Sequence, residues 1–232
     1  MNYADLAVRL EEVRERIGAA LARSGREGVE VTIVAVTKTH PVEAARAALA
    51  AGIFDLAENR VQELEEKVRG VDDPRVRWHL IGHLQRNKVR RALPLFDLLH
   101  SLDSLRLAEE LSRIAREEGR VVRALVQVNT SGEQTKGGFD SEEAVDAIGR
   151  IAEMEAIRLE GMMTMAPFEA PEAVLRSVFE RTRRLSEEAA RQVPGYRPLH
   201  LSMGMSGDYE IAVEEGSTIV RLGTVLFGAR ER

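Results

Sequence analysis

The sequence predicts an α/β protein in which about eight parallel strands alternate with helices and close into a single (β/α)8 TIM barrel. First, short apolar runs rich in β-branched residues alternate with longer amphipathic segments, a pattern typical of parallel βαβ units. Second, the 232 residues of the chain are close to the roughly 250 residues of such barrels. Third, the segment TKTHP at 37–41, after the first strand, lacks the glycines that open the phosphate loop of an open doubly wound sheet. The barrel is therefore favoured over the open sheet, with residues 1–232 expected to form one domain.

An extra helix is expected in front of the barrel. Apolar residues recur there at helical spacing, at Leu6, Leu10, Val13, Ile17 and Leu21. The first strand is predicted at 31–36, VTIVAV, because a run that is apolar nearly throughout suits a strand buried on both faces. Pro41 is suited to the first turn of the next helix, which the alanine-rich sequence carries to about Gly52.

The later elements continue the alternation of strand and helix. Apolar or alternating runs predict the remaining strands at 54–59, 77–82, 98–102, 123–129, 157–165, 198–205 and 218–228. Amphipathic segments predict the helices between them at about 60–69, 84–93, 104–118, 141–153, 171–191 and 207–214.

Composition narrows the classes of function. Hydrophobic residues make up 44% and charged residues 31%, with a net charge of −5, so no global attraction to nucleic acid or to an anionic membrane is expected. The lack of cysteine excludes disulfides, thiolate catalysis and cysteine zinc sites. The N-terminal segment has no apolar signal-peptide core, and no apolar run approaches the roughly 20 residues of a membrane span. We therefore expect a cytoplasmic protein.

Lys38 is the first candidate for chemistry. It is one of only four lysines among 33 basic residues. Active sites of such barrels lie at the C-terminal ends of the strands, and Lys38 follows the first strand on the face that carries Val34 and Val36. A partly desolvated amine at that position loses its proton more readily and can attack an aldehyde. The alternative is a solvated loop lysine.

Arg221 is the second candidate, because it interrupts the apolar strand TIVRLGTVLFG. It shares a strand face with Ile219 and Gly223. A charge in a closing strand of a barrel is costly unless it is paired or bound to a ligand. The alternative to a ligand contact is an internal ion pair with Glu58 or Asp103.

The segments SMGMSGD (202–208) and LGTVLFG (222–228) form the third feature. They follow predicted strands seven and eight, where barrels often bind phosphate. Exposed backbone N–H groups, together with Ser206 and Thr224, are suited to a phosphate dianion, and a helix N-terminus near Gly207 would strengthen the site. The alternative is ordinary turn glycine with Ser206 as a helix cap.

Other polar groups carry weaker signals. The five histidines lie on different strands or loops, so no metal site is expected. The loop 132–138 lacks the spacing of a phosphate loop and is expected to cover the site as a flexible loop. The basic cluster QRNKVRR at 85–91 is interpreted as a solvated helix face.

Six long segments are specific enough to carry a family resemblance: VAVTKTHP around Lys38, FDLAENRVQE at 54–63, WHLIGHLQRNKVR at 78–90, LVQVNTSGEQTKGGF at 125–139, LEGMMTMAPF at 159–168 and LSMGMSGDYEIAVEEGSTIVRLGTVLFGAR at 201–230. They resemble one known family, the pyridoxal phosphate homeostasis proteins (YggS/PROSC-like), which are related to the N-terminal barrel of alanine racemase. The resemblance covers nearly the whole chain and implies a pyridoxal 5′-phosphate-binding barrel of fold type III.

The resemblance also implies roles for single residues. Lys38 would form the Schiff base with the cofactor aldehyde, and Arg221 would face the pyridine nitrogen. An arginine there keeps the nitrogen unprotonated and weakens the ring as an electron sink, which suits a carrier or a racemase better than a transaminase. The phosphate would be held by Ser206, Gly223 and Thr224, and the pocket lined by Asn59, His79 and Met163.

Three functions follow from these features. The leading interpretation is a non-catalytic, monomeric protein that stores pyridoxal 5′-phosphate or delivers it to apoenzymes that depend on it. The second is a weak amino-acid racemase, for which the expected obstacle is a second base: the chain ends at Arg232, leaves no room for a tyrosine-bearing second domain, and has only Tyr3, Tyr196 and Tyr209. The third is a phosphosugar-binding barrel with the sugar on Lys38, which predicts no native chromophore.

Overall fold

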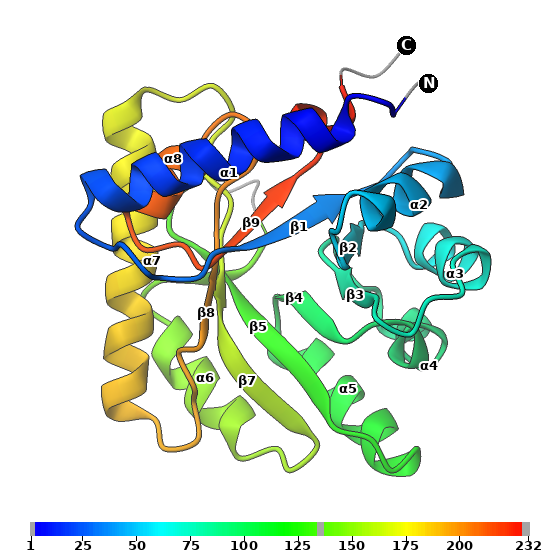
Figure 1. The fold of residues 1–232 in the computed structure, drawn as a ribbon. Coiled ribbons are helices and arrows are strands. Elements are labelled where there is room, and N and C mark those ends of the chain that lie inside the picture. Colours follow the sequence, from blue (N-terminus) through cyan, green and yellow to red (C-terminus); the bar gives the residue numbers. More distant parts are fainter. Residues whose placement is uncertain (1–2, 134–136, 229–232) are drawn as a thin grey trace.

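The computed structural model describes residues 3–133 and 137–228. In this part of the chain eight parallel strands form a closed ring, in the order β1, β2, β3, β4, β5, β7, β8, β9 and back to β1 (Figure 1). The predicted barrel is therefore confirmed. The strands of the ring are β1 Thr32–Val36, β2 Asp55–Glu58, β3 Arg77–Leu80, β4 Leu98–Leu102, β5 Val122–Asn129, β7 Ile157–Met163, β8 His200–Ser202 and β9 Ile219–Leu222.

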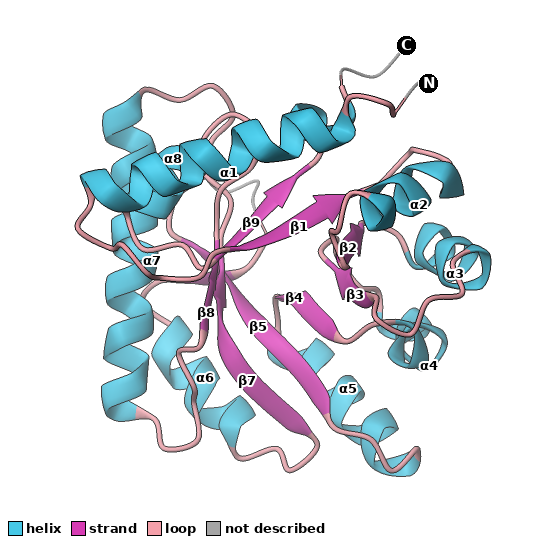
Figure 2. Ribbon diagram, viewed as in Figure 1, coloured by secondary structure: helices cyan, strands magenta, loops and turns pink. Residues whose placement is uncertain are grey.

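Helices surround the ring of strands on the outside (Figure 2). The longer ones are α1 Leu6–Arg23, α2 Val42–Ala50, α3 Val61–Gly70, α5 Leu105–Glu117, α6 Ala144–Ala152 and α7 Glu172–Gln192. Two short helices flank β9, α8 Tyr209–Glu214 and α9 Thr224–Phe227. The extra N-terminal helix α1 packs on both of them, which closes the outer layer where a full-length helix is missing. Among the described residues no helix is long and apolar enough to cross a membrane.

Two predicted strands end at least three residues earlier than the sequence pattern suggests. The strand predicted at 218–228 stops at Leu222, where its pairing with β1 ends, and Gly223 then begins the single turn of α9. The strand predicted at 198–205 is reduced to His200–Ser202, because Gly204 has a φ of 96° that a strand cannot continue through.

The helix predicted at 84–93 is broken into three single turns. They are η1 Arg86–Lys88, α4 Val89–Ala92 and η2 Leu93–Leu95. Pro94 lies in the first turn of η2 and cannot continue the helix before it, because it has no N–H and its ring clashes with the preceding turn. The two-residue strand β6 Phe139–Asp140 beside β5 was not predicted.

The apolar core has two layers. Inside the ring, residues from six strands pack together as the interior cluster, Val34, Val36, Ala57, Leu98, Leu125, Met163 and Ile219. Outside the ring, Ala35 and its equivalents on other strands pack against the helices. Val34 and Val36 thus share the face of β1 that points into the barrel.

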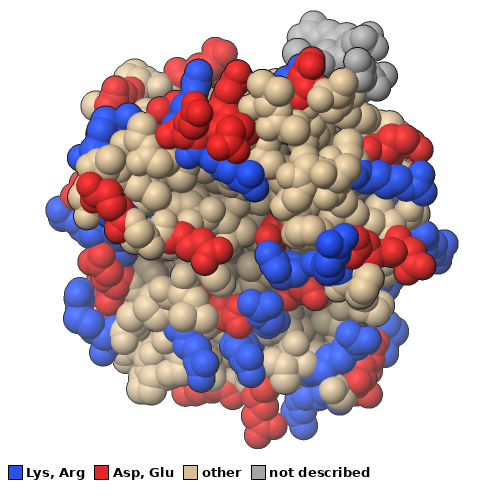
Figure 3. Space-filling model, viewed as in Figure 1, with Lys and Arg blue, Asp and Glu red and all other residues tan. Residues whose placement is uncertain are grey.

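The surface mixes charges of both signs. On the face drawn in Figure 3, basic and acidic side chains are interspersed rather than separated into patches. This distribution agrees with a chain in which 33 basic and 38 acidic residues nearly balance.

Candidate functional site

Because the strands of the ring are parallel, their C-terminal ends meet at one end of the barrel, which we call the mouth. Lys38, Asn59 and Ser206 follow β1, β2 and β8 there, and Gly223 and Thr224 follow β9. The structure therefore brings these five predicted residues to the same end of the barrel.

Lys38 lies half-buried in the turn after β1. The backbone on both sides of it is anchored. Thr37 N–H donates to the Ala57 carbonyl on β2 at 3.1 Å, and Thr39 N–H donates to Glu63 Oε2 on α3 at 3.2 Å. Thr39 has a φ of 65°, an uncommon value for a residue with a side chain. The turn that presents Lys38 is thus held by two neighbouring elements.

A buried ion pair between Lys67 and Glu58 is hydrogen-bonded to the same turn. Lys67 Nζ donates to the Thr37 carbonyl at 2.7 Å and to Glu58 Oε1 at 2.5 Å. The Thr37 hydroxyl donates to the same Glu58 oxygen at 2.5 Å. Burial raises the pKa of Glu58 to about 7, although the Lys67 ammonium and the Thr37 hydroxyl oppose the shift. Lys67 is therefore part of the scaffold next to Lys38.

Arg221 is buried inside the barrel, with 4% of its surface exposed. Its Nη1 donates to the Ser202 carbonyl at 2.7 Å and to Ser202 Oγ at 2.6 Å. Its Nη2 donates to the Thr164 carbonyl at 2.9 Å. Burial lowers the pKa of Arg221 to about 10, against the attraction of Asp208, and the guanidinium remains a cation at neutral pH.

The ion pairs considered for Arg221 from the sequence are not formed. Glu58 is bonded to Lys67, and Asp103 Oδ2 lies 2.6 Å from His83 Nδ1. This alternative is therefore not realised, because each acid bonds to a basic side chain on a neighbouring element. Among the described residues, Arg221 is held by neutral oxygens.

His79 and His100 extend the contacts of Arg221 across the barrel. His100 Nδ1 lies 2.8 Å from Ser202 Oγ, and His100 Nε2 lies 2.8 Å from His79 Nδ1. His79 Nε2 in turn lies 3.0 Å from Asp55 Oδ1. We call Asp55, His79, His100, Ser202 and Arg221 the interior network. Both ring nitrogens of His79 are used within it, so a polar contact from His79 to a ligand would break one of these bonds.

Ser206 connects the two loops predicted to bind an anion. Its Oγ accepts from Gly223 N–H at 3.3 Å and from Val225 N–H at 3.2 Å. The alternative role of Ser206 as the cap of α8 is not observed, since Asp208 is the residue before that helix. The N–H groups of Gly223 and Val225 converge on a single oxygen atom, an arrangement suited to one oxygen of a phosphate group.

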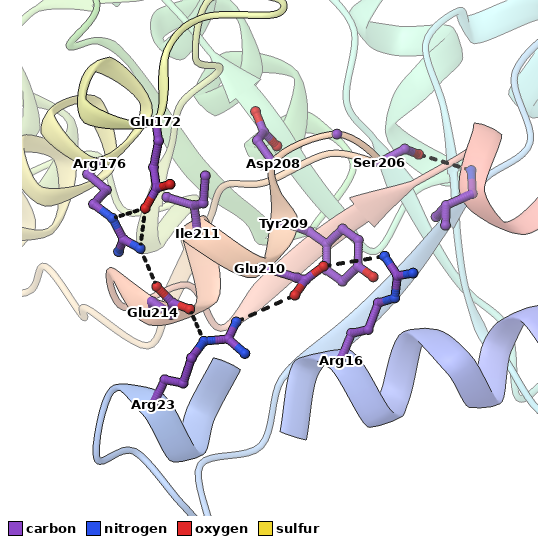
Figure 4. Close-up of a pocket in the computed structure, with 12 residues that line it drawn as sticks. Arg16, Arg23, Glu172, Arg176, Ser206, Asp208, Tyr209, Glu210, Ile211 and Glu214 are labelled. Atoms are coloured by element: carbon purple, nitrogen blue, oxygen red, sulfur yellow. Dashed lines mark hydrogen bonds and ion pairs between the residues drawn. The ribbon is translucent and has the colours of Figure 1, made fainter. Parts of the chain in front are cut away.

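The pocket on the outer side of Ser206 has a different character (Figure 4). Its arginines are paired with glutamates, and the sticks show a continuous line of ion pairs from α1 to α7. The pairs are Arg16–Glu210, Arg23–Glu210, Arg23–Glu214, Arg176–Glu214 and Arg176–Glu172. The positive charges of these arginines are thus compensated by glutamates of the same chain.

Asn59 and Met163 lie at the C-terminal ends of β2 and β7. Met163 ends β7 and is 1% exposed in the interior cluster. Asn59 is half-buried after β2, and a Cβ at Gly82 would lie 2.2 Å from its carbonyl oxygen. Only glycine at position 82 therefore lets the ends of β2 and β3 come together beside Asn59.

Asp55, His100 and Thr164 were given no role in the site from the sequence, and Ser202 appeared only as the first residue of the segment 202–208. The strand register explains the place of His100, because His79 pairs with Leu98 and His100 lies two residues further on the same face, but this register is not visible in the sequence. The loop predicted to cover the site, 132–138, lies partly outside the described residues. In the described part of the chain, no group of three or more histidine, cysteine or acidic residues could hold a metal ion.

Comparisons with known proteins agree with this architecture. Residues 8–231 match the model of the alanine racemase N-terminal domain family. A pyridoxal phosphate homeostasis protein of Aquifex aeolicus is 41% identical over 96% of this chain and 97% of its own length. The one from Escherichia coli K12 is 38% identical over 98% of this chain and 97% of its own length.

Solved structures give the same result. PipY of Synechococcus elongatus with PLP bound is 38% identical, covers 96% of this chain and 100% of its own, and superposes with a TM-score of 0.85. A protein of unknown function from Bifidobacterium adolescentis is 37% identical, covers 97% of this chain and 95% of its own, and reaches a TM-score of 0.90. An alanine racemase of Clostridium difficile, 21% identical, covers 98% of this chain and 57% of its own with a TM-score of 0.77; at this identity the likeness concerns the fold.

Proposed function

The chain belongs to the alanine racemase N-terminal domain family and, within it, to the pyridoxal phosphate homeostasis proteins, and from this premise we propose that it binds pyridoxal 5′-phosphate as a Schiff base on Lys38. In this proposal the protein serves the intracellular homeostasis of the cofactor. It acts as a monomeric carrier whose recipients are apoenzymes that need the cofactor.

One observation carries the proposal: three complementary groups meet at the mouth. Lys38 supplies a half-buried amine after β1. The segment after β9 supplies the N–H groups of Gly223 and Val225, which converge on Ser206 Oγ from the loop after β8. Arg221 supplies a buried cation that is held by neutral oxygens. A phosphorylated aromatic aldehyde has a matching part for each of these groups.

The donor sets fit the cofactor. Three N–H bonds of Arg221 have acceptors among the described residues, and an arginine side chain has about five. The remaining N–H groups suit a pyridine nitrogen that acts as an acceptor. Ser206, Gly223 and Thr224 are the proposed phosphate ligands, and Asn59, His79 and Met163 the proposed lining of the pocket. When bound, the cofactor supplies an aldehyde that reacts with amines and a ring that withdraws electrons.

The residues around the site favour a carrier over an enzyme. A cationic arginine keeps the ring nitrogen unprotonated and weakens electron withdrawal by the ring. A racemase needs a second base, for which a tyrosine is the expected residue. In this chain Tyr196 and Tyr209 are buried in the outer layer of the core. Burial raises the pKa of Tyr196 to about 12, which makes it a poor proton acceptor at neutral pH.

A weak racemase is the second candidate, and one observation favours it. His83 is exposed after β3, at the mouth, and its Nδ1 lies 2.6 Å from Asp103 Oδ2. A carboxylate that orients an imidazole in this way is a common support for a histidine base. Sustained racemisation of alanine or serine at enzyme-like rates, abolished by His83→Gln, would replace the carrier proposal by this one.

Absorbance and covalent trapping test the binding proposal directly. Protein purified or reconstituted with pyridoxal 5′-phosphate is expected to absorb in the visible, and borohydride is expected to fix the label on the peptide of Lys38. Lys38→Ala should lose the visible band, whereas the control Lys88→Ala should keep it. Label on the peptide of Lys67 or Lys88, or a band retained in Lys38→Ala, would contradict the assignment.

A further inference from the structure

The interior network spans the barrel from one ionic group to another. Its cationic end is Arg221, and its other end is Asp55, which also accepts a hydrogen bond from Arg77 Nε at 2.7 Å. Burial opposes ionisation of Asp55, but hydrogen bonds from His79 and Arg77 outweigh it and lower the pKa of the carboxyl group. Asp55 is therefore a carboxylate at neutral pH.

The two ends fix the direction of the hydrogen bonds in which they themselves take part. An arginine can only donate, so Ser202 Oγ accepts from Arg221, and its own proton is available to His100 Nδ1. A carboxylate can only accept, so His79 Nε2 must donate to Asp55. The bond between the two rings is then the remaining one to assign.

The state of His100 completes the assignment. Burial lowers the pKa of His100 well below its usual range, and the neighbouring His79 and Arg221 add to the shift. A neutral imidazole has one N–H and one acceptor nitrogen. In the arrangement that uses the free proton of the Ser202 hydroxyl, Nδ1 of His100 accepts this proton, and the single proton of His100 is on Nε2 and is donated to His79 Nδ1. Each group thus accepts on the side of Arg221 and donates on the side of Asp55.

We propose that this one-directional network holds the guanidinium of Arg221 in place, with Ser202, His100 and His79 as its positioning residues. Ser202 contacts Arg221 through both its carbonyl and its hydroxyl oxygen. The two histidines orient that hydroxyl. His100 Nδ1 accepts the hydroxyl proton and so turns it away from the guanidinium, and His79 Nδ1 accepts from His100 Nε2 and so holds the His100 ring in this tautomer. The network also connects the buried cation to the carboxylate of Asp55 without direct contact between the two charges.

The consequence for a ligand rests on the proposed function. Hydrogen bonds in a chain polarise one another in the same direction, and here they leave the remaining N–H groups of Arg221 in one orientation. If the ligand is pyridoxal 5′-phosphate, the network sets how the ring nitrogen is bound, although none of its histidines needs to touch the ring.

The first test uses the protein without cofactor. Two-bond proton–nitrogen correlations of the imidazole rings, measured by NMR at neutral pH, report which ring nitrogen carries the proton. We expect His79 and His100 to be neutral and protonated at Nε2 only. A proton on Nδ1 of His100 would reverse the direction of the network and overturn the proposal.

The second test separates positioning from packing. In Ser202→Ala we expect a mixture of His100 tautomers and a broadened Nε–H signal of Arg221, identified by its absence in Arg221→Lys. Ser202→Thr keeps a hydroxyl and should restore both signals. Ser217→Ala is the matched control, because Ser217 is a buried hydroxyl between the same strands that bonds only to backbone carbonyls. Unchanged signals in Ser202→Ala, or equal changes in Ser217→Ala, would refute the positioning role.

The affinity for the cofactor and the position of its visible band test the positioning role of Ser202 independently. Ser202→Ala is expected to weaken pyridoxal 5′-phosphate binding about 3- to 10-fold, the effect of one lost hydrogen bond, and to shift the visible band, whereas Ser217→Ala should leave the band unmoved. A wild-type protein with the expected tautomers but no label on Lys38 would refute the proposed function alone. Label on Lys38 with the opposite tautomers would refute the network alone.

Discussion

Lys67 and Arg221 are both buried cations near the mouth of the barrel, and the fold compensates their charges in different ways. Lys67 is in direct contact with the carboxylate of Glu58, and both side chains are almost completely buried. Arg221 is held by two backbone carbonyls and one hydroxyl. The charge of a cation in direct contact with an acid is compensated within the fold, whereas a cation held by neutral oxygens keeps its charge available to a ligand.

Removal of Lys67 is expected to give the largest loss of stability. In Lys67→Met the Glu58 carboxyl stays buried without its cation, and such a loss costs about 3 to 5 kcal/mol. Urea unfolding at pH 8 measures the change. Because two apolar residues need no charge compensation, the double variant Glu58→Leu, Lys67→Met should recover much of the lost stability; no recovery would mean that Lys67 acts mainly through the Thr37 carbonyl.

The pH dependence of stability sharpens the description of the same pair. The pKa of Glu58 is raised to about 7 in the folded protein, above that of an unfolded glutamate, so folding favours its protonated form. This contribution is fully present below the unfolded pKa and is lost as pH rises through about 7, by about 3 kcal/mol in total. The free energy of unfolding of the wild type minus that of Glu58→Gln should therefore fall between pH 5 and pH 8. A constant difference would show that Glu58 ionises normally.

Removal of the charge of Arg221 should change binding rather than stability. Arg221→Met leaves no buried acid without a partner, and its cost to folding should be smaller than that of Lys67→Met. Pyridoxal 5′-phosphate should bind about 10- to 100-fold more weakly, the loss expected for hydrogen bonds from a charged group. Titration followed by visible absorbance measures the affinity, and Arg221→Glu should add a shift of the band. Unchanged binding in both variants would remove Arg221 from the site.

The smallest effect is expected in the outer pocket of Figure 4. Arg176 is bonded to three glutamates but its side chain is 37% exposed, and solvent screens such pairs. Arg176→Gln should cost less than about 1 kcal/mol, and less still at high salt. It should leave pyridoxal 5′-phosphate binding unchanged. Weaker binding in this variant would extend the site into the outer pocket.

Much of the fold was predictable because it depends on local patterns. The apolar run at 31–36 led to β1 within one residue of its observed start, and LLHSL at 98–102 is β4 as predicted. The ends of β8 and β9 were not predicted, because they are set by Gly204 and by the turn at Gly223 that faces Ser206. These features depend on contacts between loops that are distant in the sequence.

The residues of the candidate site likewise fall into those that the sequence indicates and those that it does not. Lys38, Arg221 and Ser206 could be found from the sequence, because each departs from a simple pattern at the end of a strand or inside it. The partners of Arg221 could not be found in this way. His79 and His100 are 21 residues apart, and His100 and Ser202 are 102 residues apart, so no local spacing indicates their contact.

The sequence by itself determined the alternation of strands and helices and the residues at the strand ends, because these follow from periodicity and polarity along the chain. Only the tertiary structure decided which buried charge has a partner. The packing of α3 on β2 placed Lys67 beside Glu58, and the pairing of β8 with β9 in the closed ring placed Ser202 beside Arg221. The physical reason is that the cost of a buried charge depends on the atoms within hydrogen-bonding distance of it, and in a barrel those atoms come from different strands and helices.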